Sequence, residues 1–295
     1  MTLAARVRRQ LAKQAPRLEE VAVRAHWRRR NRSRSFPRES VSHPAQRACI
    51  ESLNRDGYAI CRFEEIFGDR TLFDEASEHV QRLYEARPQT SGAAAGSKET
   101  YLIKLASGQF DIGHPFVRIA LDPRVLNIAN GYLRLRSTLR ALELWYTHPS
   151  PGQAVQTQLW HRDADDVMNV KLFVYFSDVT KAAGPLTVAP RTHPLGDRRR
   201  IPPHDVDRRS SDEQMAQVVS PDEWRVLAGP PGTVVLADTC GYHKQLKPES
   251  GERLKLVAQY VSGTPYVPPA LELTGVDATT LTEDQHYAVF DRARA

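Results

Sequence analysis

The chain has 295 residues, of which 41% are hydrophobic and 26% are charged, a balance typical of a globular protein rather than a disordered one. Its three cysteines, Cys49, Cys61 and Cys240, are too few and too widely spaced for a disulfide framework or a structural zinc site. No stretch approaches the run of about 18 apolar residues that a membrane span needs, and the N-terminus lacks the apolar core of a secretory signal. We therefore expect a soluble, cytoplasmic protein.

The positive charge is concentrated at the N-terminus. Residues 1–40 contain 12 Lys/Arg and 3 Asp/Glu, whereas residues 41–295 contain 29 and 32, so the net charge of +6 belongs to the N-terminal segment. Apolar spacing predicts an amphipathic helix within residues 1–30, and residues 28–34 are expected to form a basic linker. Such a segment could dock on an acidic partner, or pack on the body or on a second copy of the chain. A charge run is unspecific and gives little support to nucleic-acid binding.

The expected elements divide the chain into a helical part and a strand-rich part. Helices are expected over residues 45–54, 70–87 and 117–133, the last interrupted at Asp122-Pro123, with short strands over 58–63 and 101–105. Further strands are expected over residues 139–146, 155–160, 170–176, 184–190, 232–238 and 254–261. Helices followed by strands favour a mainly β barrel or jelly roll braced by N-terminal helices. We expect an extension over residues 1–40 and one domain over residues 41–295, with a surface insertion near 197–221.

Four polar residues at the ends of these strands suggest a metal site with a neighbouring anion site. His161 and Asp163 follow the expected strand 155–160, and residues two apart in an extended segment point to the same side. His243, just after strand 232–238, could supply a third ligand. Two histidines and one carboxylate, with the remaining positions open, are the ligand set of non-haem Fe(II) oxygenases. Arg253 begins the last strong strand, where its guanidinium could hold a carboxylate through two parallel hydrogen bonds.

Four sequence blocks occur in an order that resembles the phytanoyl-CoA dioxygenase family of Fe(II)/2-oxoglutarate-dependent dioxygenases. The blocks are residues 158–163, 183–186, 188–193 and 238–243. The resemblance covers roughly residues 45–265 and implies a double-stranded β-helix (jelly-roll, cupin-like) core. It implies that His161, Asp163 and His243 bind Fe(II), and that Arg253 pairs with the far carboxylate of 2-oxoglutarate. Lys104 occupies a place comparable to a lysine with which the family often binds the same co-substrate.

The same resemblance implies a reaction. The chain would consume 2-oxoglutarate and O₂, release succinate and CO₂, and hydroxylate or otherwise oxidise an unactivated C–H bond of a small-molecule metabolite. Relatives that halogenate have a small residue in place of Asp163, so the aspartate favours an oxidation that needs no halide. Residues 197–221 and the loop around 87–100 are expected to close over the pocket. The alternative is a catalytically silent jelly-roll binding protein whose basic tail docks on an acidic partner.

Each residue taken alone has a simpler interpretation. His161 and Asp163 could form a hydrogen-bonded pair without a metal, and His243 could be an ordinary histidine at a strand end. The blocks in this order favour the metal site over these interpretations. His193 also follows an expected strand, but its proline-bounded turn favours a structural corner, so it is not counted as a ligand. Cys240 shows no arrangement that would activate a thiol.

Overall fold

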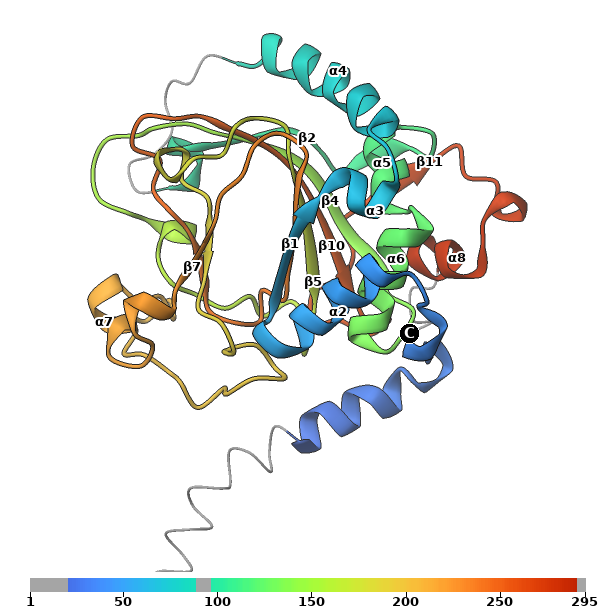
Figure 1. Cartoon of the computed structure of the whole chain (residues 1–295), viewed down its shortest axis with the longest axis horizontal. Helices are drawn as coiled ribbons and strands as arrows, with labels where there is room; N and C mark the ends of the chain where they lie inside the picture. Colours follow the sequence, from blue (N-terminus) through green and yellow to red (C-terminus); the bar gives the residue numbers. More distant parts are fainter. Residues whose placement is uncertain (1–20, 89–96, 291–295) are drawn as a thin grey trace, which may run out of the picture.

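The computed structural model describes residues 21–88 and 97–290, and at its centre two antiparallel sheets face each other (Figure 1). The larger sheet has the strand order β1 (Tyr58–Arg62), β8 (Thr233–Ala237), β5 (Val170–Tyr175), β10 (Arg253–Val261), β4 (Thr138–Thr147) and β2 (Leu102–Ser107). The smaller sheet has the order β7 (Arg225–Leu227), β6 (Leu186–Val188) and β9 (His243–Gln245). Strand β11 (Glu272–Thr274) pairs in parallel with β3 (Gln109–Asp111). The predicted jelly-roll class is confirmed.

Successive side chains of a strand point to opposite faces of the large sheet, and so they contribute to two separate hydrophobic clusters. In β5, Leu172 and Val174 belong to the cluster beneath the helices, whereas Phe173 and Tyr175 join Leu186 of β6 in the barrel interior. The covering helices are α2 (Pro44–Asp56), α3 (Phe63–Phe67), α4 (Thr71–Glu85), α5 (Pro115–Ala120), α6 (Pro123–Leu133) and α8 (Glu283–Val289). The short helix α7 (Asp212–Ala216) lies on the other side of the barrel, near β7 (Figure 1). One face of the large sheet is therefore left to line the barrel.

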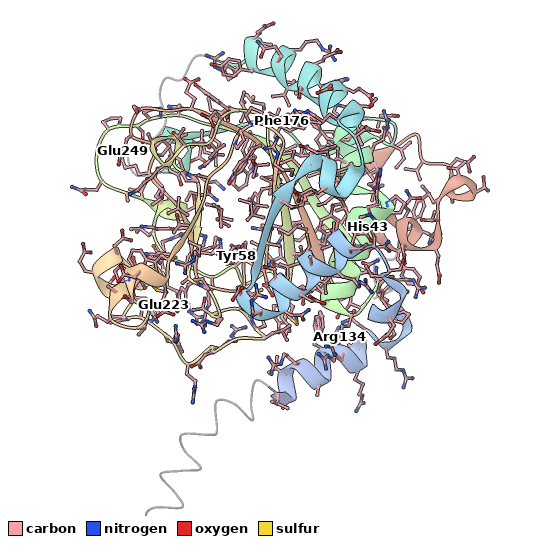
Figure 2. The ribbon with its side chains drawn as sticks, viewed as in Figure 1. His43, Tyr58, Arg134, Phe176, Glu223 and Glu249 are labelled. Atoms are coloured by element: carbon pink, nitrogen blue, oxygen red, sulfur yellow. The ribbon has the colours of Figure 1, made fainter. Side chains whose placement is uncertain are left out.

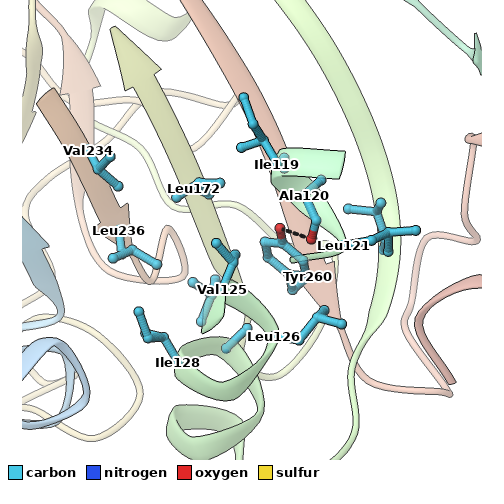
Figure 3. Packing of buried hydrophobic residues seen from close by; sticks show 14 of the residues in the cluster. Ile119, Ala120, Leu121, Val125, Leu126, Ile128, Leu172, Val234, Leu236 and Tyr260 are labelled. Carbon is cyan, nitrogen blue, oxygen red and sulfur yellow. Dashed lines mark hydrogen bonds between the residues drawn. The ribbon is translucent and has the colours of Figure 1, made fainter. Parts of the chain in front are cut away.

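Helices α5 and α6 pack on the outer face of the large sheet (Figure 3). The Tyr260 hydroxyl of β10 donates a hydrogen bond to the Ala120 carbonyl at 2.7 Å, so a buried polar group is satisfied within this apolar layer. Phe176 follows the end of β5 (Figure 2). Its ring stacks on that of Phe73 in α4, with ring centroids 5.1 Å apart. These contacts fix the sheet against the helices and leave its other face to the site.

The expected helix over residues 117–133 is two helices, as the Asp122-Pro123 interruption predicted. The Asp122 carboxylate accepts a hydrogen bond from the Arg124 N–H at 2.9 Å and so caps α6. The expected strand over residues 155–160 is wrong. That segment contains a 3₁₀ turn over Gln156–Gln158, in which Gln156 has a φ of 52° and the Gln158 side chain accepts a hydrogen bond from the Val155 N–H. Local side-chain to main-chain bonding competes here with strand pairing.

The N-terminal segment packs on the body from residue 21 onwards. Residues 21–30 are helical, and the buried Trp27 donates a hydrogen bond from its indole N–H to the Asp166 carboxylate at 2.9 Å. The expected basic linker over residues 28–34 is wrong, because the buried Arg34 donates to the carbonyls of Arg136 and Tyr287 at 2.7 and 2.8 Å. The first part of the expected amphipathic helix, residues 1–20, lies outside the described residues.

Within residues 21–88 and 97–290, no helix combines the length and the apolar character needed to cross a bilayer.

Replacing Trp27 tests the attachment of the N-terminal helix. Trp27→Ala removes a side chain that is 3% exposed, and a buried Trp→Ala change lowers the free energy of unfolding by about 3–5 kcal/mol. Val21→Ala on the same helix, at a position 55% exposed, should change it by less than about 0.5 kcal/mol. Urea unfolding of both variants measures the difference. Equal stabilities would show that Trp27 does not anchor the helix in solution.

Candidate active site

The two segments that carry the predicted metal ligands, one before β5 and one at the start of β9, are joined through their backbones. The His161 N–H donates to the His243 carbonyl and the His243 N–H donates to the His161 carbonyl, both at 3.0 Å. The Asp163 N–H donates to the Thr239 carbonyl at 2.8 Å. The Asn169 side-chain oxygen accepts from the N–H and the hydroxyl of Thr239 at 3.1 and 2.9 Å. The positions of the predicted ligands are therefore set by main-chain pairing between two segments distant in sequence.

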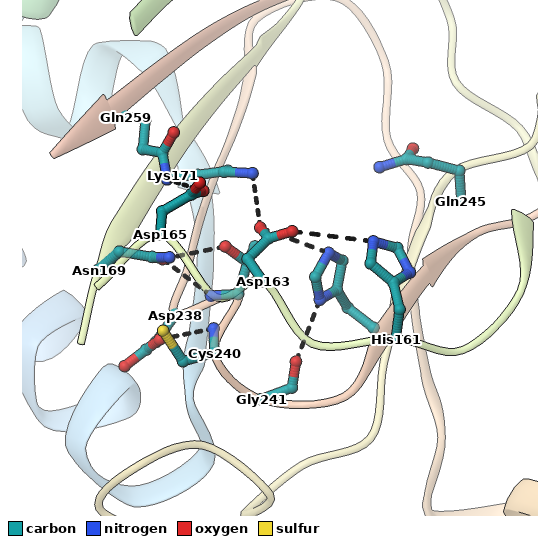
Figure 4. A network of polar contacts seen from close by, with 12 residues as sticks. His161, Asp163, Asp165, Asn169, Lys171, Asp238, Cys240, Gly241, Gln245 and Gln259 are labelled. Carbon is teal, nitrogen blue, oxygen red and sulfur yellow. Dashed lines mark hydrogen bonds and ion pairs between the residues drawn. The ribbon is translucent and has the colours of Figure 1, made fainter. Parts of the chain in front are cut away.

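The structure brings His161, Asp163 and His243 together, with one candidate ligand atom from each within 4.8 Å of the others (Figure 4). The Nε2 atoms of His161 and His243 lie 3.9 and 3.8 Å from the nearest carboxylate oxygens of Asp163. Each imidazole is oriented through its Nδ1, which lies 2.9 Å from the Leu159 carbonyl in His161 and 3.0 Å from the Gly241 carbonyl in His243. A proton on Nδ1 leaves the Nε2 lone pair of each ring available to a metal.

Burial and neighbouring charge set the protonation states that metal binding needs. Burial lowers the pKa of His161 and lowers the pKa of His243 to about 3, so both imidazoles are neutral at pH 7. Burial acts against ionisation of Asp163, but the charge and hydrogen bond of Lys171 together with the interactions of His243 and His161 outweigh it, so the pKa of that carboxyl lies below its ordinary value. Lys171 Nζ lies 2.6 Å from Asp163 Oδ2. Two neutral imidazoles and one carboxylate fit Fe(II) with open positions.

Two buried cations lie on the inner face of β10. Arg253 is 0% exposed, and its weak bonds go to the Thr147 hydroxyl and the Ala183 carbonyl at 3.4 and 3.5 Å. Lys255 Nζ donates to the Gln245 side-chain oxygen at 2.9 Å. Burial lowers the pKa of Arg253 to about 10 and lowers the pKa of Lys255 well below its ordinary value.

Within the described part of the chain, neither of these two cations has a carboxylate partner, and the Arg253 Nε has no hydrogen-bond partner at all. A buried charge is costly unless it is paired. The residues present therefore fit a dicarboxylate bound inside the barrel.

Lys104 is not brought into contact with the metal ligands. It lies on the edge strand β2, its side chain is 39% exposed, and Nζ is 2.7 Å from a Glu143 carboxylate oxygen. The strand register pairs Lys104 with Trp145, and Trp145 with Lys255, so Lys104 shares the inner face of the sheet but lies two strands from β10. The prediction that Lys104 binds the co-substrate stays a prediction.

Lys171 and Lys255 were not singled out by sequence reasoning. Each interrupts a strongly apolar strand, and Lys255 stands two residues after Arg253, where the period of two places both side chains on one face. That alternation was a usable signal. The same alternation of side chains would also suit a lysine at the rim of the barrel. Only the tertiary structure shows that Lys255 is fully buried.

His193 lies outside the metal cluster, in agreement with its interpretation as a corner residue. It is buried, with Nε2 3.2 Å from the Asn54 carbonyl, and burial lowers its pKa to about 4. A Cβ on Gly57, where φ is 84°, would come within 2.7 Å of the His193 ring, so the corner requires glycine there. Burial raises the pKa of the Cys240 thiol well above its ordinary value, which leaves it without nucleophilic character.

A cavity of about 620 Å³ opens beside Asp163. Its walls come from residues 162–167, the segment 194–208, residues 240 and 242, Tyr266, and the N-terminal helix through residues 23 and 24. The charged insertion expected near 197–221 thus contributes to this wall. Residues 89–96, within the other loop expected to cover the pocket, lie outside the described residues.

Among the solved structures, two of SnoN have TM-scores above 0.5, which supports the same fold. One structure is titled as the epimerase SnoN in complex with Fe³⁺, alpha ketoglutarate and nogalamycin RO; identity is 19%, 81% of this chain and 93% of that chain are covered, and the TM-score is 0.53. A second SnoN structure is 17% identical, with 81% of this chain and 93% of that chain covered and a TM-score of 0.51. EctD from S. alaskensis in its apoform is 19% identical, with 76% of this chain and 86% of that chain covered and a TM-score of 0.49. No curated protein matches the chain.

A family model described as phytanoyl-CoA dioxygenase matches residues 53–245. This range includes both loops that carry His161, Asp163 and His243. On the strength of that match, the chain belongs to the phytanoyl-CoA dioxygenase family of Fe(II)- and 2-oxoglutarate-dependent enzymes.

Proposed function

We propose that this chain is an oxygenase that uses Fe(II), 2-oxoglutarate and O₂ to hydroxylate, or otherwise oxidise, an unactivated C–H bond of a small molecule. The observation that carries the proposal is the convergence of His161, Asp163 and His243 above a barrel interior where buried Arg253 has no carboxylate partner among the described residues. Family membership supports the same cofactors. In hydroxylation, substrate, 2-oxoglutarate and O₂ become hydroxylated substrate, succinate and CO₂, with one oxygen atom in each of the first two products.

His161, Asp163 and His243 would hold the iron, which supplies the oxidising chemistry when it is bound. The chain provides the orientation of these ligands. The Leu159 and Gly241 carbonyls fix the two imidazole rings, and Lys171 holds one oxygen of the Asp163 carboxylate. Outer hydrogen bonds of this kind commonly change metal affinity by about 10- to 100-fold.

Arg253 would pair with the far carboxylate of 2-oxoglutarate, although it lies beyond the residues matched by the family model. Lys255 is the second cation that we assign to this carboxylate, because it is buried on the same face and bound to Gln245, two residues after the ligand His243. A carboxylate entering here would pair the two cations and recover part of the cost of burying them. Lys104, engaged with Glu143, is the competing candidate.

The type of oxidation is the less constrained part of the proposal. The structure titled as the epimerase SnoN indicates that one fold can serve more than one type of reaction. Asp163 supplies a carboxylate where halogenating relatives have a small residue, which supports oxidation without halide. Hydroxylation adds one oxygen atom to the substrate, whereas epimerisation leaves its mass unchanged, so mass spectrometry of the product separates them.

Metal binding is the first testable consequence. His161→Ala and His243→Ala should each weaken Fe(II) binding by at least about 100-fold in anaerobic titration calorimetry, because each removes one of three protein ligands. His204→Ala, an exposed histidine outside the cluster, should bind as the wild type does. If the two ligand variants retain full affinity, the assigned metal site is wrong.

Co-substrate binding separates the three candidate cations. Arg253→Met should weaken 2-oxoglutarate binding by about 30- to 1000-fold, as expected when one partner of a buried charge pair is lost. Lys255→Met should weaken it by about tenfold or more. Lys104→Ala should weaken 2-oxoglutarate binding only if Lys104 takes the part of the lysine with which the family often binds this co-substrate. Equal affinity of Lys255→Met and the wild type would remove Lys255 from the site.

Turnover tests the enzyme against the silent binding protein. With Fe(II), 2-oxoglutarate and O₂, the wild type should release succinate in the presence of candidate substrates, and His161→Ala should release none above background. Chromatography of succinate measures both. A wild-type chain that binds neither Fe(II) nor 2-oxoglutarate would contradict the proposal and favour the binding protein.

A further inference from the structure

A cavity of about 280 Å³ lies where the end of the N-terminal helix meets the body. It is lined by Arg28, Asn31, Arg32, Ser35, Leu133, Arg134 and Leu135. Figure 2 shows Arg134 beside the N-terminal helix. None of these lining residues belongs to the described wall of the cavity beside Asp163. The proposed oxygenase reaction therefore gives this place no part to play.

Main-chain pairing fixes the two sides of this cavity relative to each other. Ser35, after the N-terminal helix, forms an isolated β-bridge with Leu135, after α6. The Phe36 N–H donates to the Arg134 carbonyl at 3.3 Å. Arg134 itself ends α6 in the left-handed conformation, with a φ of 59°, which is uncommon for a residue other than glycine. The arginine is thus held at the junction by ordered backbone.

The cavity brings together three arginines that lack acidic partners. Arg28, Arg32 and Arg134 are exposed, and among the described residues none of the three side chains forms an ion pair or a hydrogen bond. Partial burial, followed by the charges of Arg134 and Arg24, lowers the pKa of Arg28. Like charges from the helix and from the body therefore face each other across the junction.

Two helix ends contribute charge of the opposite sign, but too little to cancel the arginines. The N-terminal helix ends at residue 30 and α6 ends at Leu133. A helix C-terminus carries about half a negative charge, so two of them offset about one of the three positive charges. The positive field that remains in this concave site attracts anions.

We propose that this cavity binds a phosphate-bearing small molecule, held by Arg28 and Arg32 from the helix side and by Arg134 from the body. A guanidinium donates paired hydrogen bonds to phosphate oxygens, and the Ser35 hydroxyl lies in the same lining as a further donor. A phosphate group carries about 1.5 to 2 negative charges at pH 7, whereas a carboxylate carries one. Three unpaired arginines therefore favour phosphate.

The bound phosphate bridges the N-terminal helix and the body. The Trp27 indole already anchors the helix, whereas the repulsion between Arg28 and Arg134 opposes its docking. An anion between the two arginines removes that repulsion, so it stabilises the docked helix by linkage. Residues 23 and 24 of the same helix line the cavity beside Asp163. Occupancy of the phosphate site thus bears on the order of that wall.

Inorganic phosphate, phenyl phosphate and benzoate test the ligand class. Equilibrium dialysis against the full chain, loaded with Fe(II) and 2-oxoglutarate without O₂, measures the binding of each. The tighter of the two phosphates should bind about tenfold or more tightly than benzoate, and its affinity should fall as salt is raised. Comparison of the two phosphates shows whether the site takes free phosphate or a phosphate ester.

Variants of the lining locate the binding. Arg28→Gln/Arg134→Asn should lose about 30-fold or more in phosphate affinity, and asparagine tolerates the left-handed conformation at residue 134. Arg28→Gln alone, which leaves the end of α6 unchanged, should lose about tenfold. The matched control is Arg29→Gln/Arg30→Gln, with the same change of net charge at exposed positions of the same helix outside the lining. It should bind phosphate as the wild type does.

Hydrogen exchange of the amides of residues 21–30 tests the bridge. Phosphate should slow this exchange in the wild type and leave it unchanged in Arg28→Gln/Arg134→Asn. A wild type that binds neither phosphate, or a double variant that keeps full affinity, overturns the site. Equal loss in the control variant also overturns it, because general charge then explains the binding. Wild-type exchange that phosphate does not slow overturns the bridge between helix and body.

Discussion

The two hydrogen bonds between the backbones of His161 and His243 are the constraint on which the site depends. They join a loop after β4 to the start of β9 and bring two imidazoles to a ring-centroid distance of 4.3 Å. Main-chain pairing fixes this approach before any metal binds, since the bonds do not involve the ligand nitrogens. A separate contact between Nδ1 of each ring and a main-chain carbonyl then leaves Nε2 directed at the other candidate ligands.

This arrangement explains how a site can be ordered in loops. The segment before His161 is a 3₁₀ turn rather than a strand, yet the Asp163 N–H is held by the Thr239 carbonyl and Thr239 is held by Asn169. The large sheet supplies Asn169 just before β5 and Lys171 within it. Rigid elements therefore position the ligands indirectly, through hydrogen bonds to the loops.

Charge is distributed differently on the two sides of the metal position. Inside the barrel, Arg253 and Lys255 are buried without a carboxylate partner in the described part of the chain, an arrangement that costs stability. Outside it, Arg198 and Arg208 line a more open cavity. The buried pair suits a small co-substrate held tightly. The N-terminal helix completes the outer side through Arg24, with Trp27 anchoring it to Asp166.

The sequence by itself determined the family and the jelly-roll class, and it predicted the three residues that the structure brings together, because the ligand blocks are local and apolar alternation reports which strand face is buried. It also placed the break at Asp122-Pro123, where proline chemistry is local. Only the tertiary structure decided that residues 155–160 turn, that Arg34 is buried, and that Lys255 lies within the barrel while Lys104 pairs with Glu143. These outcomes depend on partners far away in the chain, and neither composition nor periodicity records such contacts.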